Sequence, residues 1–138
     1  MGYRSDVMIL LYGTPKDCDI VCNLFEVSDT DADLKTWFNK CKREMVDDGV
    51  KYVHWVFTDI KWYDDCERAR EKLFVFVEEH ENNHDDAEGR RRLAIEMARI
   101  GESEDDNEWY GTDYHEYLLN LRRDITYPDF LDNATKGE

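Results

Sequence analysis

The spacing of hydrophobic positions predicts strands in four parts of the chain. Residues 5–13, SDVMILLYG, are apolar at odd and even positions alike, which is typical of a strand covered on both faces. Residues 50–62 alternate and are rich in aromatic and β-branched side chains, so a second strand is expected there. Residues 91–101 and 115–127 alternate in the same way, and we expect them to form an antiparallel pair joined by an acidic connection.

Helical periodicity separates the predicted strands. Residues 13–27 begin with Thr14 as a cap and Pro15 at the first helical position. A second helix is expected from Ser28 or Asp29 as far as Met45, ended by the following Asp-Asp-Gly. A third, residues 64–84, carries an apolar stripe. The stripe consists of Cys66, Ala69, Leu73, Phe76, Val77 and His80.

This element order, β-α-α-β-α-β-β, predicts an α+β fold. We expect a four-stranded, mostly antiparallel sheet with about three helices packed on it. A chain of 138 residues is the usual size of one domain. The prediction is therefore a single domain over residues 1–130, followed by a flexible tail at 131–138.

Charge narrows the classes of partner. The chain has 33 acidic and 18 basic residues, giving a net charge of −15, so its surface repels nucleic acid and anionic membranes. We expect a protein partner that is basic or itself binds nucleic acid. The alternative is that the acidic surface only keeps the protein in solution. The apolar run from Val7 is too short to span a bilayer, and a soluble protein is expected.

The cysteine spacing gives no sign of a metal site or a disulfide framework. The chain contains no Cys-x-x-Cys pair, and the expectation is buried free thiols in a reducing cytosol. The cysteines are Cys18, Cys22, Cys41 and Cys66.

The segment HENNH, residues 80–84, fits the His-Glu-x-x-His pattern of zinc hydrolases. If this chain were such an enzyme, His80 and His84 would bind the zinc ion and Glu81 would act as the general base. The flanks are polar rather than apolar, and no third ligand stands out, so a helix end that carries histidines competes with the zinc interpretation. We expect no cofactor and no metal, and keep His80 and His84 as the alternative.

Two segments, KWYDD (61–65) and GESEDDNEWYG (101–111), combine tryptophan and tyrosine with carboxylates. Together they predict a binding surface. Exposed aromatic side chains anchor many protein interfaces, and an acidic rim selects a basic partner. In the alternative, Trp62 and Trp109 are core residues. The predicted surface comprises Trp62, Tyr63, Asp64, Asp65, Glu102, Glu104, Asp105, Asp106, Glu108, Trp109 and Tyr110.

Four short motifs resemble a group of small uncharacterised proteins of tailed bacteriophages and prophages that begin MGYRS followed by Asp or Glu. The motifs are MGYRSDV (1–7), KWYDD (61–65), RIGESEDD (99–106) and LNLRRDI (119–125). The resemblance implies expression in the cytoplasm of a bacterial host and an accessory role during infection. That group has no assigned catalytic residues, so none are carried over.

These observations predict a non-enzymatic phage accessory protein. It would bind a host or phage protein through its acidic and aromatic surface, with inhibition by nucleic-acid mimicry as one form of that activity. Two other functions stay open: a zinc-dependent hydrolase that uses HENNH, and a protein that sequesters a small molecule between sheet and helices. The sequence does not indicate the partner's identity or the oligomeric state.

Overall fold

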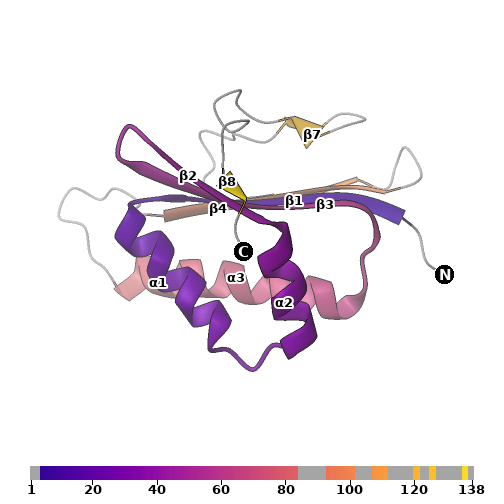
Figure 1. The fold of residues 1–138 in the computed structure, drawn as a ribbon, viewed down its shortest axis with the longest axis horizontal. Helices are drawn as coiled ribbons and strands as arrows, with labels where there is room; N and C mark the ends of the chain where they lie inside the picture. Colours follow the sequence, from indigo (N-terminus) through magenta and orange to yellow (C-terminus); the bar gives the residue numbers. More distant parts are fainter. Residues whose placement is uncertain are drawn as a thin grey trace.

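The computed structural model describes residues 4–83, 93–101, 107–111, 120–121, 125–126 and 135–136. Its helices all cover the same face of one twisted sheet, and β7 (Ile125–Thr126) lies on the other side of the sheet (Figure 1). The remaining described elements are β1 (Arg4–Gly13), α1 (Pro15–Glu26), α2 (Ala32–Cys41), β2 (Lys42–Asp47), β3 (Val50–Lys61), α3 (Asp64–Asn83), β4 (Leu93–Ile100), β5 (Asn107–Gly111), β6 (Asn120–Leu121) and β8 (Thr135–Lys136).

The described residues confirm an α+β domain with three helices and an antiparallel sheet, but the sheet differs from the prediction. Five strands follow the order β5-β4-β1-β3-β2, and the two-residue β8 extends the β2 edge. Each neighbouring pair is antiparallel. The prediction of four strands was wrong because β2 was assigned to a helix and β5 to a connection.

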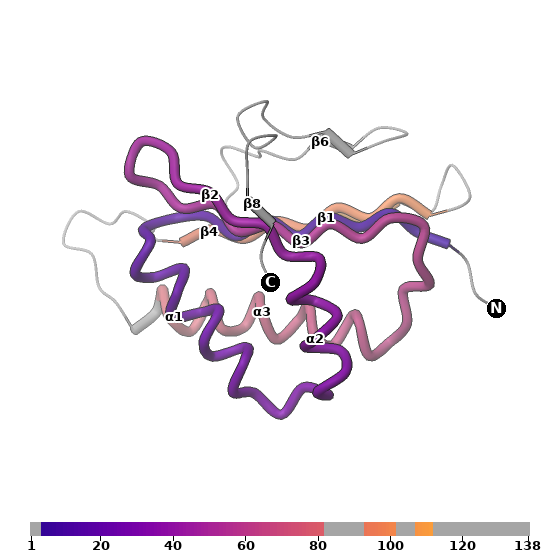
Figure 2. The backbone as a smooth tube through the Cα atoms, viewed as in Figure 1, coloured from indigo at the N-terminus to yellow at the C-terminus, as the bar shows by residue number. Residues whose placement is uncertain are grey.

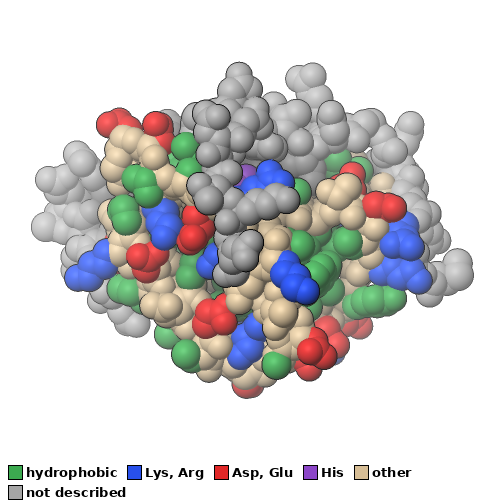
Figure 3. Space-filling model, viewed as in Figure 1, with side chains coloured by type: hydrophobic (Ala, Val, Ile, Leu, Met, Phe, Trp, Pro, Cys, Tyr) green, Lys and Arg blue, Asp and Glu red, His purple; other side chains and the backbone are tan. Residues whose placement is uncertain are grey.

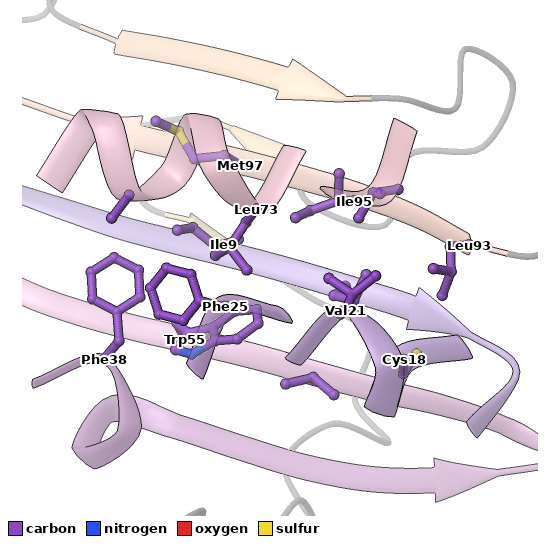
Figure 4. Close-up of a cluster of buried hydrophobic side chains, with 14 of the residues drawn as sticks. Ile9, Cys18, Val21, Phe25, Phe38, Trp55, Leu73, Leu93, Ile95 and Met97 are labelled. Atoms are coloured by element: carbon purple, nitrogen blue, oxygen red, sulfur yellow. The ribbon is translucent and has the colours of Figure 1, made fainter. Parts of the chain in front are cut away.

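The sheet buries a core on its helix side and a smaller one on its other side. β1 is central, with Val7, Ile9 and Leu11 facing the helices while Met8 and Leu10 face away. This confirms the prediction of a strand covered on both faces. The core side chains from β3, β4 and the helices meet those of β1, as Figure 4 shows for Trp55 and Met97.

Local chemistry sets the helix starts. Thr14 caps α1 through its side chain and Pro15 follows, as predicted. The cap of α2 is Asp31, whose Oδ1 accepts hydrogen bonds from the backbone N–H groups of Asp33 at 2.9 Å and Leu34 at 3.2 Å. The predicted start at Ser28 or Asp29 was therefore too early, because the side chain of Asp31 satisfies the first helical N–H groups.

The second predicted helix also ended too late. α2 stops at Cys41, and residues 42–47 form β2, which pairs with β3 in a projecting hairpin (Figure 2). Asp48 has φ 51° and Gly49 φ 78°, the left-handed conformations of a tight hairpin turn. Asp-Gly between two alternating segments is a strong hairpin signal, and pairing with β3 overrides the helical pattern.

The C-terminal predictions fall largely outside the described residues. In the segment expected to pair with β4, residues 120–121 instead pair with 125–126 in a separate two-stranded sheet. The main-sheet neighbours of β4 are β1 and β5. Two residues of the predicted tail, Thr135 and Lys136, form β8 against Arg43 and Glu44.

Candidate functional site

A groove opens at the end of the sheet where β3 leaves and α3 begins. Its volume is about 670 Å³, and Figure 3 shows this end of the molecule at the right. The walls come from the start of β1, the end of β3, α2 and the first turn of α3. The described lining residues are Arg4, Asp31, Asp33, Leu34, Trp37, Ile60, Lys61, Tyr63, Asp65 and Cys66.

The floor of the groove is apolar and aromatic. Trp37 is half-buried, and its ring lies 4.7 Å from that of Phe57 and 5.9 Å from that of Phe38, centroid to centroid. Leu34 and Ile60 pack against the same core cluster. The indole is therefore held rigidly from behind while part of it remains accessible in the groove.

A β-bulge in β3 places Ile60 on the groove side. The register with β1 runs from Val7 opposite Phe57 to Ser5 opposite Ile60, so β3 contains one extra residue. Asp59, at φ 51°, takes up the distortion, and its N–H donates to Asp6 Oδ1 at 2.8 Å. If residues 57–60 alternated strictly, Ile60 would face the side of the sheet opposite to Phe57, and the bulge returns it to the helix side.

Charged side chains of both signs surround the floor. Asp31 is used as the cap of α2, and Asp65 accepts a hydrogen bond from Arg68 at 3.0 Å. Arg4 Nη1 donates to the backbone oxygen of Asp59 at 3.1 Å. Tyr63 is 60% exposed, so this aromatic side chain is presented to solvent at the groove rather than used in the core.

The wall behind Tyr63 is held by a second cluster. Trp62 Nε1 donates to Glu67 Oε2 at 2.7 Å, and Arg70 Nε donates to Glu67 Oε1 at 2.6 Å. The Arg70 guanidinium carbon lies 4.5 Å from the ring centroid of Tyr110 and 4.9 Å from that of Phe74. Arg70 is only 8% exposed, so it connects α3 to β5 instead of serving as a surface cation.

The structure divides the predicted binding surface. Tyr63 and Asp65 line the groove, whereas Trp62 lies behind it and Asp64 is exposed at the start of α3. Glu102, Glu104, Asp105 and Asp106 lie outside the described residues.

The β5 part of that surface is itself split between the two faces of the sheet. Tyr110 pairs with Met97 on the helix side. Trp109 pairs with Ala98 and packs with the cluster on the opposite side. Glu108 accepts a hydrogen bond from Arg99 Nε at 3.1 Å. Trp109 therefore belongs to a different surface from Tyr63.

Sequence reasoning missed several groove residues. Leu34 and Trp37 pack against the core and also border the opening. Arg4, Ile60 and Lys61 were not among the predicted site residues, because the bulge and the strand pairing that bring them together are not visible in a local pattern.

The first histidine of HENNH has a structural partner. His80 Nε2 lies 2.8 Å from Asp17 Oδ1, and both side chains are buried. Glu81 Oε1 accepts a hydrogen bond from the N–H of Leu93 at 2.6 Å, at the start of β4. His84 lies outside the described residues. Among the described residues, no group of three or more His, Cys, Asp or Glu side chains is arranged to hold a metal ion.

Thr14, Asp17 and His80 form a chain of hydrogen bonds that differs from a hydrolytic triad. The hydroxyl of Thr14 and the imidazole of His80 both contact the carboxylate of Asp17. In a triad the imidazole lies between hydroxyl and carboxylate, where it can take the hydroxyl proton. Here the carboxylate is in the middle, an arrangement suited to fixing α3 against the start of α1.

The thiols are not activated. Burial raises the pKa of Cys18 to about 12 and that of Cys22 to about 11, and it also raises the pKa of Cys66 in the groove wall. Little thiolate exists at neutral pH, so these residues are poor nucleophiles. All four cysteines are free, as predicted, and Cys18 and Cys66 are buried while Cys22 and Cys41 are half-buried.

Comparisons of the chain with protein-family models, with curated proteins and with solved structures found no match. Across the described residues, no helix has the length and apolar character needed to cross a membrane. The geometry of the site is accordingly the basis for a functional proposal.

Proposed function

We propose that this chain is a non-enzymatic binding protein whose groove between α2 and α3 docks a segment of a protein partner. The observation that carries the proposal is the combination of a rigid aromatic floor at Trp37 with the exposed ring of Tyr63 and a carboxylate rim. Aromatic anchors in a preformed concave site are common centres of binding energy in protein interfaces.

The charge of the whole chain supports a partner that is basic overall. A net charge of −15 attracts a positively charged protein over several ångströms and slows the approach of acidic ones. In the proposed setting, suggested by the resemblance to phage proteins, the partner is a host or phage protein in the bacterial cytoplasm. A nucleic-acid-binding partner would combine the required charge with an accessible site.

Nucleic-acid mimicry is the more specific form of this proposal, and α3 offers it limited support. Glu67 is engaged by Trp62 and Arg70, and Glu71 lies 3.8 Å from Arg70 Nη2. A mimic needs carboxylates presented to the partner rather than paired within the helix. The other candidate carboxylates, residues 102–106, lie outside the described residues.

Sequestration of a small molecule is a second candidate, favoured by the size of the groove. A volume of about 670 Å³ falls within the range of roughly 300–1,000 Å³ typical of ligand pockets. A screen of amphipathic small molecules by thermal melting tests it, because a ligand that binds only the folded state raises the melting temperature.

The experiment that tests the proposal is affinity capture from bacterial lysate at low and high salt, read by mass spectrometry. The site variant combines Asp33→Asn with Tyr63→Ala, and the control combines Glu78→Gln with Val46→Ala. Each pair changes one exposed carboxylate and one exposed side chain, and Val46 lies in the projecting hairpin. The proposal requires a stoichiometric partner that the site variant loses and the control retains, and loss of that partner at high salt supports a basic partner.

A partner that the site variant and the control capture equally would move the binding site away from the groove. Capture of no stoichiometric partner, together with a melting shift from a small molecule, would favour sequestration instead. Both variants must melt within a few degrees of the unchanged protein for the comparison to be valid.

A further inference from the structure

We infer that the groove takes an amphoteric segment of the protein partner: an apolar side chain over Trp37, a basic side chain toward the start of α2 and a carboxylate toward Arg4 and Lys61. This inference rests on the proposed function and specifies the chemistry of the segment that docks. Its basis is the separation of opposite charges on different walls of the groove.

The positive wall is formed by two adjacent strands. Arg4 of β1 and Lys61 of β3 are partners in the antiparallel register, and both line the groove. The Cβ atoms of residues directly opposite each other in such a pair are about 5 Å apart, so both positive charges belong to the same wall. Arg4 Nη1 is anchored on the backbone oxygen of Asp59, which steadies the guanidinium at this wall.

The negative wall is the start of α2. Asp31 and Asp33 are two residues apart there, and Asp33 is exposed at the groove. The side chain of Asp31 already accepts the N–H groups of Asp33 and Leu34, so the helix end is capped and a ligand meets carboxylate instead of bare N–H groups. Asp65, on α3, is balanced by Arg68.

The apolar floor lies between the two walls. At the right of Figure 3, hydrophobic side chains lie beside Lys and Arg side chains, and Asp and Glu side chains are visible both below and above them. A segment with only basic side chains would place one of them against Arg4 and Lys61, and a segment with only acidic ones would meet Asp33. A segment with one charge of each sign beside an apolar anchor satisfies both walls.

The test uses short synthetic peptides with the same Leu-Phe centre. The flanks are lysine on one side and glutamate on the other in both orders, lysine on both sides, or glutamate on both sides. Binding is followed by NMR through the indole N–H cross-peak of Trp37, which is assigned with a Trp37→Phe variant. This signal reports occupancy of the groove itself, so general attraction of lysine peptides to the acidic surface is not counted.

Three variants of the full chain complete the experiment. Lys61→Glu reverses the positive wall, Asp33→Lys reverses the negative wall, and Glu78→Lys is the control, an equal charge change on an exposed part of α3. In one of its two orders, the peptide with one lysine and one glutamate flank should bind the unchanged protein roughly threefold or more tighter than the all-lysine or the all-glutamate peptide. This is the size of effect expected from exposed ion pairs. Lys61→Glu should then prefer the all-lysine peptide, Asp33→Lys the all-glutamate peptide, and Glu78→Lys should behave like the unchanged protein.

Tightest binding of the all-lysine peptide to the unchanged protein would overturn the amphoteric inference and leave the proposed protein-binding function standing. The same holds if the reversals at Lys61 and Asp33 leave the preference unaltered. If no peptide shifts the Trp37 cross-peak, the inference is overturned as well. If affinity capture also yields no stoichiometric partner, the proposed function falls with it.

Discussion

At the residue scale, the buried contact between His80 and Asp17 has the clearest energetic consequence. It joins the end of α3 to the first turn of α1, and Thr14 donates a hydrogen bond to the same carboxylate. His80→Ala should lower the free energy of unfolding by about 3–5 kcal/mol, because it leaves a buried carboxylate without its imidazole partner. Urea unfolding at neutral pH measures this.

Glu79→Ala is the matched control for His80→Ala, since Glu79 precedes it on the same helix and is exposed. Its expected cost is within about 0.5 kcal/mol. Equal costs for the two variants would contradict the structural role of His80. A double variant with Asp17→Asn should cost less than the sum of the single changes, because the two side chains form one contact.

His54 predicts a pH dependence of stability. It is buried on the sheet face opposite the helices, where burial, assisted by the positive charge of Arg43, lowers its pKa from 6.5 to about 4. The unfolded chain therefore binds a proton between these pH values while the folded chain does not. The stabilisation is complete above pH 6.5 and is lost as the pH falls toward 4, at a cost of up to about 3 kcal/mol.

Urea unfolding at several pH values from 7 down to 4.5 measures this dependence, and His54→Gln supplies the comparison. Carboxylates that titrate in the same range contribute equally to both proteins, so the difference between the two curves isolates the imidazole. Parallel curves for the two proteins would show that His54 is not the group responsible.

At the element scale, the bulge in β3 decides which residues reach the groove. Insertion of one alanine between Asp59 and Ile60 should shift Ile60 by one position in the alternation, turn it away from the helix side and cost more than about 2 kcal/mol of stability. Asp59→Gly keeps the extra residue and relieves an L-residue at φ 51°, so its stability should stay within about 1 kcal/mol of the unchanged protein. Urea unfolding and the Trp37 indole cross-peak measure both effects.

An insertion variant that retained full stability and an unchanged Trp37 environment would show that the register of β3 at the bulge does not position this wall. Asp6→Ala probes the same feature independently, because Asp6 Oδ1 accepts the Asp59 N–H. Loss of that acceptor should cost roughly 1 kcal/mol.

At the scale of the whole molecule, net charge predicts how stability responds to salt. With 33 acidic against 18 basic residues, self-repulsion is greater in the compact state than in the unfolded chain. Sodium chloride screens this repulsion, so adding it should raise the melting temperature by roughly 3 °C, equivalent to about 1 kcal/mol.

Potassium chloride at equal ionic strength is the control, and the same rise would attribute the effect to screening rather than to binding of sodium. A fall in melting temperature would mean that exposed ion pairs outweigh self-repulsion. One candidate is the contact of Lys51 with Asp19 at 2.6 Å and Glu44 at 3.3 Å.

The sequence by itself determined the elements whose signals are local. A run that is apolar at odd and even positions identified β1, and alternation identified β3. Thr14 and Pro15 identified the start of α1, and the apolar stripe identified α3. These succeeded because side-chain periodicity and capping depend on neighbours within a few residues. The Asp48-Gly49 turn was an equally local signal that was misread, since the helical stripe through Met45 competed with it.

The tertiary structure alone decided which residues make a site. Pairing of β1 with β3 brings Arg4 beside Lys61, and the bulge at Asp59 sets which face of the sheet Ile60 occupies. Trp109 and Tyr110 are neighbours in sequence, yet they lie on opposite faces of the sheet. Register, bulges and helix packing depend on contacts between residues far apart in the chain, so no local pattern contains them.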